Sequence, residues 1–276
     1  MLSMLKLLAT TTLLSSILVA SPNKKVEEFL EESFSKNPNI SDLSVHVNDT
    51  IAIKSMKGWS ALIVTIDATV TKPQNRKIKQ KMIWFTDGNV ITKDLTEIDT
   101  GLSLKDMVSP TFKPAQYKRE NLIYGRADAE HKVAIFSDPL CPFCRTFVPE
   151  AIKEMRKQPK KFAIYYYHFP LPSIHPAAVE LSLAAVAAEL KGRKNVVLDM
   201  YKVEVDPREK DVKKILAAFN KTMKTNITPA DIKTPDVMKH YNSDMTTAEE
   251  LMVGGTPTMF FDGTLDRTKR KYKKVK

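Results

Sequence analysis

The segment KVAIFSDPLCPFC, residues 132–144, is an apolar strand pattern followed by two cysteines with two residues between them. It predicts a short buried strand over 131–137 and a long helix that starts just after Cys141. Pro142 suits the first helical position, where the N–H that proline lacks has no partner in any case. The sequence therefore places both cysteines at the N-terminus of one helix.

Two cysteines at this position suit thiol–disulfide exchange. The unpaired backbone N–H groups and the positive end of the helix dipole favour a thiolate at Cys141. Cys144 follows one turn later on the same side, so a disulfide can close between the two sulfurs. The Cys141 thiolate can attack a substrate disulfide, and Cys144 can resolve the mixed disulfide. We therefore expect redox catalysis at CPFC.

Structural packing and metal binding are the two alternative uses of the cysteine pair. Packing alone does not usually place two cysteines at one helix N-terminus with a proline between them. A zinc site needs two further ligands, and the five histidines show no HxxxH-type spacing. We expect neither a metal nor an organic cofactor.

A second motif lies more than 100 residues further on, where VGGTPT (253–258) precedes the apolar strand MFF. A Thr256-Pro257 bond that follows two glycines and enters a strand is a candidate cis-proline turn. An ordinary trans turn is the alternative. In the cis form the turn would expose the backbone of Thr256 beside the disulfide, where an extended substrate segment could add as a strand.

Residues 21–100 are expected to form a first domain with a role in binding or assembly. Apolar residues recur at helical spacing over 24–34, which predicts a helix. From residue 43 the pattern changes to the alternation of strands, with a tight turn at Asp87-Gly88. The alternating stretches are 44–47, 51–56, 60–71 and 79–85. One helix and a curved antiparallel sheet are therefore predicted.

Residues 123–276 are predicted to form an α/β domain. A second strand over 162–170 follows the helix that begins at the CPFC motif. A mostly helical insertion then occupies about 174–250, and strand character returns at TMFFDG, 258–263. Residues 101–122, which contain two prolines, are expected to be a partly helical linker between the two domains.

The first 20 residues have the pattern of a secretory signal peptide. Lys6 supplies a positive charge, residues 7–19 are mainly apolar, and Ala20 offers a small residue for cleavage. An uncleaved anchor helix is the alternative, but this stretch is short of the roughly 20 residues that span a bilayer. We therefore expect an exported, soluble protein.

The composition, 43% hydrophobic and 27% charged over 276 residues, is that of an ordinary globular protein and argues against disorder. Two cysteines exclude a disulfide-dense scaffold. The net charge of +11 is concentrated at residues 267–276, which hold seven Lys or Arg and no acid. We expect a solvated tail there, with contact to anionic lipid or nucleic acid as the alternative. Elsewhere no basic stripe is interleaved with aromatics, so no nucleic-acid partner is expected.

Together these motifs resemble a known family. CPFC at the start of a helix, Pro149 eight residues after Cys141, and Thr256-Pro257 before a strand resemble thioredoxin-fold oxidoreductases. More narrowly, FSDPLCPFC, YYHFPL, the helical insertion and GGTPTMFFDG resemble the bacterial periplasmic DsbC/DsbG disulfide isomerase group. Upstream, MIWFTDGNVITKDLTEI resembles the end of that group's N-terminal dimerisation domain.

The resemblance implies roles for the site residues. Cys141 would be the nucleophile, Cys144 the resolving thiol, and Thr256-Pro257 the cis-proline loop. Pro142 and Phe143, the pair between the cysteines, would help to set the redox potential. The resemblance also implies a cystatin-like dimerisation domain over 21–100, a linker helix and a V-shaped homodimer.

The predicted function is a dimeric disulfide isomerase or reductase of a Gram-negative periplasm, acting on misbridged exported proteins. Its apolar inner faces would hold unfolded substrate like a chaperone, and an inner-membrane redox partner would keep it reduced. Ile135 stands six residues before Cys141, where thioredoxin and the DsbA oxidase have a buried acid. Ile135, and Thr256 before the proline, favour the isomerase. The alternatives are an oxidase on the same dimeric scaffold and a non-catalytic chaperone.

Overall fold

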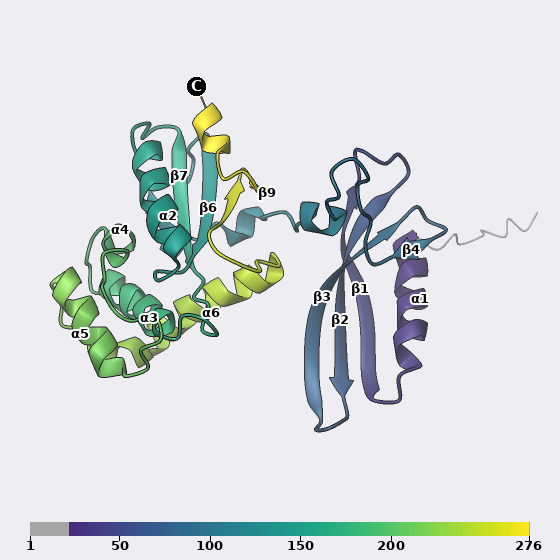
Figure 1. Ribbon diagram of the computed structural model, residues 1–276, viewed down its shortest axis with the longest axis horizontal. Coiled ribbons are helices and arrows are strands. Elements are labelled where there is room, and N and C mark those ends of the chain that lie inside the picture. Colours follow the sequence, from purple (N-terminus) through teal and green to yellow (C-terminus); the bar gives the residue numbers. More distant parts are fainter. Residues whose placement is uncertain (1–21, 276) are drawn as a thin grey trace, which may run out of the picture. The chain divides into compact units, whose positions relative to one another are not determined.

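The computed structural model describes residues 22–275, so the predicted signal peptide over 1–20 lies outside the described residues. The described chain forms two units, which divide between Lys105 and Asp106 (Figure 1). This division lies inside the segment expected to be a linker. None of the helices over 22–275 has the length and apolar character needed to cross a membrane.

The first unit is one helix on a four-stranded antiparallel sheet, as the sequence predicts. Its elements are α1 (Pro22–Ser35), β1 (Ile40–Ala52), β2 (Ser60–Val70), β3 (Arg76–Thr86) and β4 (Ile91–Thr92). The strands lie in the order β1-β2-β3-β4. Val26 and Leu30 on α1 are buried in one cluster with Leu62, Val64 and Trp84 of the sheet. The apolar stripe of α1 therefore forms the core of this unit.

The sequence separates 44–47 and 51–56 into two strand segments, and the structure differs there. Residues 44–47 and 51–52 lie in one strand, β1, which pairs with β2 along its length and has register irregularities between Ser41 and Ser44 and between Val47 and Asp49. The strand ends at Ala52 and the chain then turns. Bulges of this kind insert a residue and interrupt the alternation from which a strand is predicted.

The second unit combines a five-stranded sheet with five helices. Its strands and helices are β5 (Leu122–Tyr124), β6 (His131–Ser137), α2 (Pro142–Met155), β7 (Phe162–His168), α3 (Ala177–Leu190), α4 (Val196–Met200), α5 (Val212–Met223), α6 (Pro235–Glu250), β8 (Thr258–Phe261) and β9 (Thr264–Leu265). The strand order is β5-β7-β6-β8-β9. Strands β6 and β7 are parallel, and the other neighbours are antiparallel. The predicted α/β fold with a helical insertion is confirmed.

Short 3₁₀-helices complete the chain. They are η1 (Leu104–Met107), η2 (Pro114–Gln116), η3 (Arg119–Asn121), η4 (Asp231–Lys233) and η5 (Lys271–Lys274). Between η1 and η3, Phe112 is buried and packs against Phe136 and Tyr167 of the second unit. Part of the expected linker therefore packs into the core of the second unit.

Strand β6 is buried on both faces, and its side chains enter two separate clusters. Val133 and Ile135 pack with α2 and the helices of the insertion, whereas Ala134 and Phe136 pack on the opposite face with Phe112. A strand covered on both faces reads as a continuous apolar run, which is the pattern found in the sequence. The end of this strand is thereby fixed in the middle of the unit, next to the cysteines.

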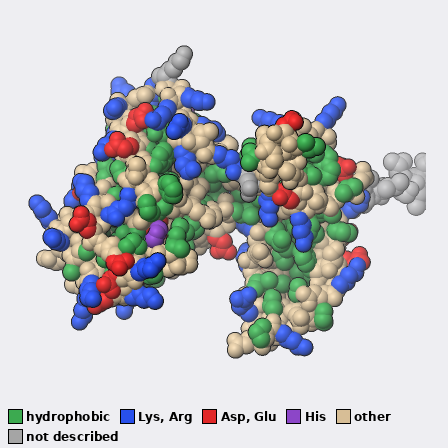
Figure 2. Space-filling view, in the orientation of Figure 1, with side chains coloured by type: hydrophobic (Ala, Val, Ile, Leu, Met, Phe, Trp, Pro, Cys, Tyr) green, Lys and Arg blue, Asp and Glu red, His purple; other side chains and the backbone are tan. Residues whose placement is uncertain are grey.

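The expectation of a solvated C-terminal tail is correct only in part: Arg267, Arg270, Lys273 and Lys274 are exposed, but the segment is attached to the core. Tyr272 in η5 is only 4% exposed and belongs to the same core cluster as α2. Lys273 Nζ lies 3.2 Å from Glu154 Oε2 on that helix. One aromatic residue among the lysines therefore anchors the segment. In Figure 2, Lys and Arg side chains are spread over the visible face of both units and do not gather in one patch.

Candidate active site

The two cysteines lie where the sequence places them. Cys141 is the N-cap of α2, Pro142 is the first helical residue, and Cys144 lies in the first turn. Both thiols are free; Cys141 is 6% exposed and Cys144 is fully buried. The side chain of Phe143, by contrast, is 77% exposed. A buried sulfur pair therefore lies next to an exposed apolar residue.

The cis-proline turn lies directly against the nucleophile candidate. The Thr256-Pro257 peptide bond is cis, as the sequence suggests. Cys141 Sγ donates a hydrogen bond to the Thr256 carbonyl oxygen at 3.7 Å, across 115 residues of sequence. The two motifs that point to redox chemistry thus form one site, with the peptide backbone of Thr256 beside the Cys141 sulfur.

The two sulfurs differ in their surroundings. Burial raises the pKa of the Cys144 thiol to about 11, although the hydroxyl groups of Ser137 and Thr256 and the backbone of Asp138 oppose the shift. Cys144 is therefore a thiol at neutral pH. It must lose a proton before it can attack a disulfide, because the thiolate is the nucleophile.

A buried hydroxyl network lies beside Cys144. Ser137 Oγ and Tyr201 Oη are 2.6 Å apart, and Tyr201 Oη is 2.9 Å from Tyr166 Oη. Burial raises the pKa of both tyrosines, so the network is neutral at physiological pH. Ile135 is fully buried at the position where thioredoxin carries an acid. Cys144 therefore lies beside neutral hydroxyl groups, and an apolar side chain occupies the position of the thioredoxin acid.

Asp138 is a site residue for which the sequence indicated no role. Its carboxylate is fully buried. One oxygen, Oδ1, accepts hydrogen bonds from the backbone N–H groups of Leu140 at 2.7 Å and Cys141 at 3.1 Å. The other, Oδ2, accepts from the Leu171 N–H and from His175 Nδ1, both at 2.9 Å. Asp138 therefore joins the loop that carries Cys141 to the loop that follows β7.

Part of this arrangement has a signal in the sequence. An Asp side chain that accepts from N–H groups two and three residues later forms an Asx-turn, and Asp-Pro is a common start of such turns. The bonds from Leu171 and His175 have no local signal, because they join segments 33 and 37 residues away from Asp138.

A second buried polar cluster lies at the end of β7. Asp244 accepts hydrogen bonds from Asn121 Nδ2 at 2.7 Å and from the His168 backbone N–H at 2.9 Å, and His240 Nε2 lies 3.7 Å away. Burial raises the pKa of Asp244 to about 8 and lowers that of His168 to about 3. These groups are therefore largely uncharged at neutral pH, which suits a structural role.

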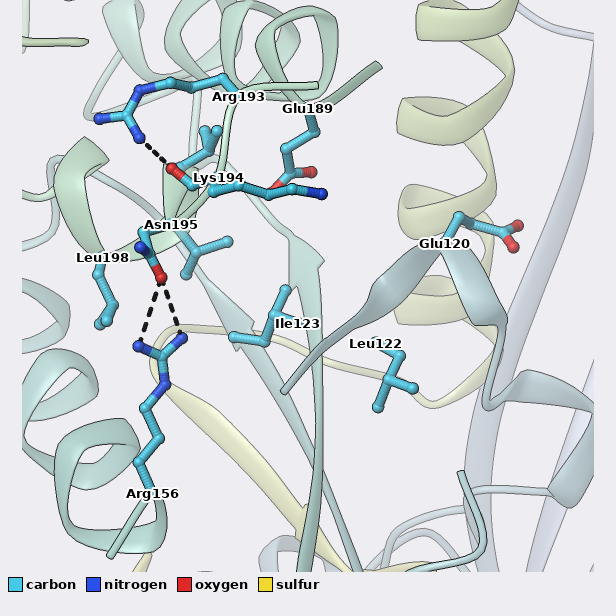
Figure 3. A pocket seen from close by; sticks show the side chains of 11 residues that line it. Glu120, Leu122, Ile123, Arg156, Glu189, Arg193, Lys194, Asn195 and Leu198 are labelled. Atoms are coloured by element: carbon cyan, nitrogen blue, oxygen red, sulfur yellow. Dashed lines mark hydrogen bonds between the residues drawn. The ribbon is translucent and has the colours of Figure 1, made fainter. Parts of the chain in front are cut away.

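The unit also has a cavity of about 270 Å³ at the other end of α2 (Figure 3). It is lined by Arg156, which directly follows the helix, and by Glu189, whose pKa burial raises to about 7. The 14 residues of α2 span about 21 Å, so this cavity is separate from the cysteines. Across residues 22–275, no three His, Cys, Asp or Glu side chains are grouped to hold a metal ion.

Comparison with known proteins agrees with this geometry. Residues 118–276 match the family model described as thioredoxin. The chain belongs to the thioredoxin family. The expected relationship to thioredoxin-fold oxidoreductases is confirmed at the level of the family, and the DsbC/DsbG subgroup is not decided by the match.

A curated relative is the Na⁺/H⁺ antiporter NhaA 1 of Mycolicibacterium gilvum, 27% identical over 158 residues, or 56% of this chain. The same-named protein of Mycolicibacterium vanbaalenii is 26% identical over 154 residues, or 55% of this chain. This chain spans about a quarter of the length of each relative. Ion transport is therefore the activity named for those longer proteins.

Solved structures with a similar fold come from several bacteria. ScsC of Proteus mirabilis in a transitional conformation is 22% identical, with a TM-score of 0.46, over 58% of this chain and 71% of that one. Oxidised BdbD of Bacillus subtilis is 16% identical, with a TM-score of 0.46, over 60% and 92%. A thioredoxin-like oxidoreductase of Silicibacter pomeroyi is 19% identical, with a TM-score of 0.42, over 55% and 86%.

Proposed function

We propose that this protein is a thiol:disulfide interchange enzyme in which Cys141 is the nucleophile and Cys144 the resolving thiol. The observation that supports it best is the position of the Cys141 sulfur. It lies at the N-terminus of α2 and 3.7 Å from the carbonyl oxygen that precedes a cis-proline. A substrate segment that pairs with the Thr256 backbone would bring its own disulfide to that sulfur.

The exchange takes place in two steps. The Cys141 thiolate attacks one sulfur of a substrate disulfide; a Cys141–substrate disulfide forms, and the second substrate sulfur leaves as a thiolate. In isomerisation a substrate thiolate then attacks the mixed disulfide and releases Cys141, with no net transfer of electrons. In reduction Cys144 loses its proton and attacks the Cys141 sulfur, and the bound substrate sulfur leaves as a thiolate. The enzyme then holds the Cys141–Cys144 disulfide, and the substrate has gained two electrons; its two thiolates take up the Cys144 proton and one proton from solvent.

The proposed substrates are misbridged exported proteins in a Gram-negative periplasm, and the proposed assembly is a homodimer formed through residues 21–100. The resemblance of the sequence to the DsbC/DsbG group and the signal-peptide pattern over 1–20 support this setting. The exposed Phe143 beside the sulfurs suits an unfolded, apolar substrate. An inner-membrane partner would return the enzyme to its dithiol form, because each net reduction leaves a Cys141–Cys144 disulfide.

Recovery of scrambled, fully oxidised ribonuclease by the chain 21–276 in a glutathione buffer tests the proposal. We expect recovery with the wild type and none with Cys141→Ser, while Cys144→Ser should accumulate mixed disulfides with substrate. Rapid oxidation of reduced ribonuclease without recovery of the scrambled form would make the protein an oxidase. A Cys141→Ser variant as active as the wild type would refute the assignment. Sedimentation of the wild type tests the homodimer.

A further inference from the structure

A buried pair of ionisable groups beside the nucleophile has no role in the exchange chemistry described above. Asp138 and His175 are linked by a 2.9 Å hydrogen bond, and the carboxylate also accepts from the Cys141 N–H at 3.1 Å. A fully buried carboxylate is thus one hydrogen bond away from the backbone of the nucleophile. Its position therefore bears on the loop that carries the Cys141 sulfur.

The orientation of the His175 ring follows from its partner. An ionised carboxylate only accepts hydrogen bonds, so Nδ1 carries the proton in this pair. Within residues 22–275, His175 Nε2 has no hydrogen-bond partner and is not sealed from solvent, and 13% of the side chain is exposed. His175 can therefore gain or lose a proton at Nε2 without breaking its bond to Asp138.

This protonation changes the charge beside the nucleophile. With neutral imidazole the Asp138–His175 pair has a charge of −1, which disfavours a nearby thiolate. With imidazolium the pair is neutral and this opposition disappears. Imidazole is the side chain that ordinarily changes charge between about pH 5 and 8.

Other ionisable groups lie on the segments packed around His175, and none forms an ion pair with it. Arg145 on α2 donates to the carbonyls of Tyr201 and Val203. The Ala177 N–H that follows the His175 loop donates to the Pro207 carbonyl, so the segment around Pro207 packs on this side. The remaining ionisable groups are Cys144, Glu150, Lys153 and Glu154 on α2, Glu180 and Glu189 on α3, and Asp206, Arg208 and Glu209 around Pro207.

We infer that His175 is a positioning residue of the thiol–disulfide site, which holds Asp138 through Nδ1 and offsets the Asp138 charge when Nε2 is protonated. This inference rests on the proposed function. It makes the reactivity of Cys141 depend on a histidine 34 residues away in sequence. It also separates two contributions of the same side chain, a hydrogen bond and a charge.

Two substitutions separate these contributions. His175→Asn keeps an N–H donor near the Nδ1 position but cannot become charged, whereas His175→Ala removes both. The measurement is the rate of alkylation of Cys141 by iodoacetamide in the reduced chain 21–276, followed by peptide mass at pH 6 and pH 8.5. Cys144 is buried and protonated over this range, so Cys141 is the thiol that reacts.

The expected result is a difference that depends on pH. One uncompensated neighbouring charge lowers the thiolate fraction about tenfold, and the greater nucleophilicity of a more basic thiolate offsets part of this. His175→Asn should therefore react about threefold slower than wild type at pH 6 and within about twofold of it at pH 8.5. His175→Ala should be slower at both. Should His175→Asn fail to fold, His175→Ala still tests the charge, because its rate relative to wild type should be lower at pH 6 than at pH 8.5.

A matched control is available in the same unit. His131 Nδ1 lies 2.8 Å from Asp262 Oδ2, a pair of the same kind at the opposite end of β6. His131→Asn should follow the wild type at both pH values. If wild type catalyses exchange but His175→Asn matches it at both pH values, or is slowed equally at both, the inference is wrong. If wild type catalyses no exchange, the proposed function itself fails.

Discussion

Two buried aspartates lie beside the carboxyl ends of the neighbouring parallel strands β6 and β7, and they differ in the number of hydrogen bonds that they accept. Asp138 receives four hydrogen bonds, from three backbone N–H groups and His175. Asp244 receives two, from Asn121 and the His168 N–H. Burial raises the pKa of Asp244 to about 8. The same residue type thus holds a loop in place at one strand end and takes up a proton at the other.

The comparison indicates that the number of hydrogen-bond donors around a buried carboxylate decides whether its charged form is favoured. Several N–H donors favour the charged form and replace the lost hydration, whereas two leave most of the desolvation penalty in place. Two of the donors of Asp138, the N–H groups of Leu140 and Cys141, come from the loop of the nucleophile, so its carboxylate lies against that loop. Those of Asp244 come from β7 and η3, away from the cysteines.

The largest effect is expected at Asp138. Asp138→Ala removes the acceptor of three buried N–H groups and His175, so the free energy of unfolding should fall by about 3 kcal/mol or more. Asp138→Asn should lose less, because its carbonyl still accepts from Leu140 and Cys141, although its NH2 group faces the Leu171 N–H and His175. Urea unfolding at pH 7 measures both. Equal losses for the two variants would show that the hydrogen bonds do not matter.

Asp244→Asn tests the other member of the comparison. The folded state holds a proton on Asp244 up to about pH 8, whereas an unfolded carboxyl releases it near its ordinary value of 3.8. Wild-type stability due to this group therefore falls as pH rises from about 4 to 8. Asn has no such proton, so the stability advantage of wild type over the variant should shrink across that window. Urea unfolding at pH 5 and pH 8 measures it, and a constant advantage would contradict the raised pKa.

Tyr201→Phe tests the hydroxyl network next to the end of β6. It removes bonds of 2.6 Å to Ser137 and 2.9 Å to Tyr166, so the free energy of unfolding should fall by about 1 kcal/mol. Tyr165→Phe is the matched control, because its ring is also buried and its hydroxyl has no hydrogen-bond partner among the described residues. An equal loss in both variants would show that the network adds no stability.

The smallest effect is expected at His131, whose pair with Asp262 is partly exposed. His131→Asn should change the free energy of unfolding by less than about 0.5 kcal/mol at pH 7. Thermal unfolding beside the His175 variants measures this. A loss as large as that of His175→Ala would mean that burial and the number of linked groups do not determine how much each His–Asp pair stabilises the fold.

The sequence determined the local features of this protein. The apolar run before Cys141 predicted β6, Pro142 marked the start of α2, and the glycines before Thr256-Pro257 marked a turn that is cis in the structure. These features depend on periodicity, on the missing N–H of proline and on neighbouring residues, which are all properties of short stretches. The α/β class and the helical insertion followed from the order of such stretches.

Short strands were harder to predict. Strands β5 and β9 have three and two residues, too few to show a period, and exist because they pair with β7 and β8. The basic C-terminal segment looked solvated because charge dominates its composition. Its basic side chains are mostly exposed, but burial of Tyr272 attaches the segment to the core. In each case a contact with another part of the chain outweighed the local pattern.

The surroundings of the cysteines were decided by the tertiary structure. The parallel pairing of β6 with β7 brings the loop after β7 against Asp138, so His175 reaches a carboxylate 37 residues before it. Tyr201 comes from the segment after α4 and contacts Ser137 at the end of β6. The sequence identified the two sulfurs, since their chemistry lies in the residues themselves. The folded chain selected the groups around them, because hydrogen bonding and burial act through space and not along the sequence.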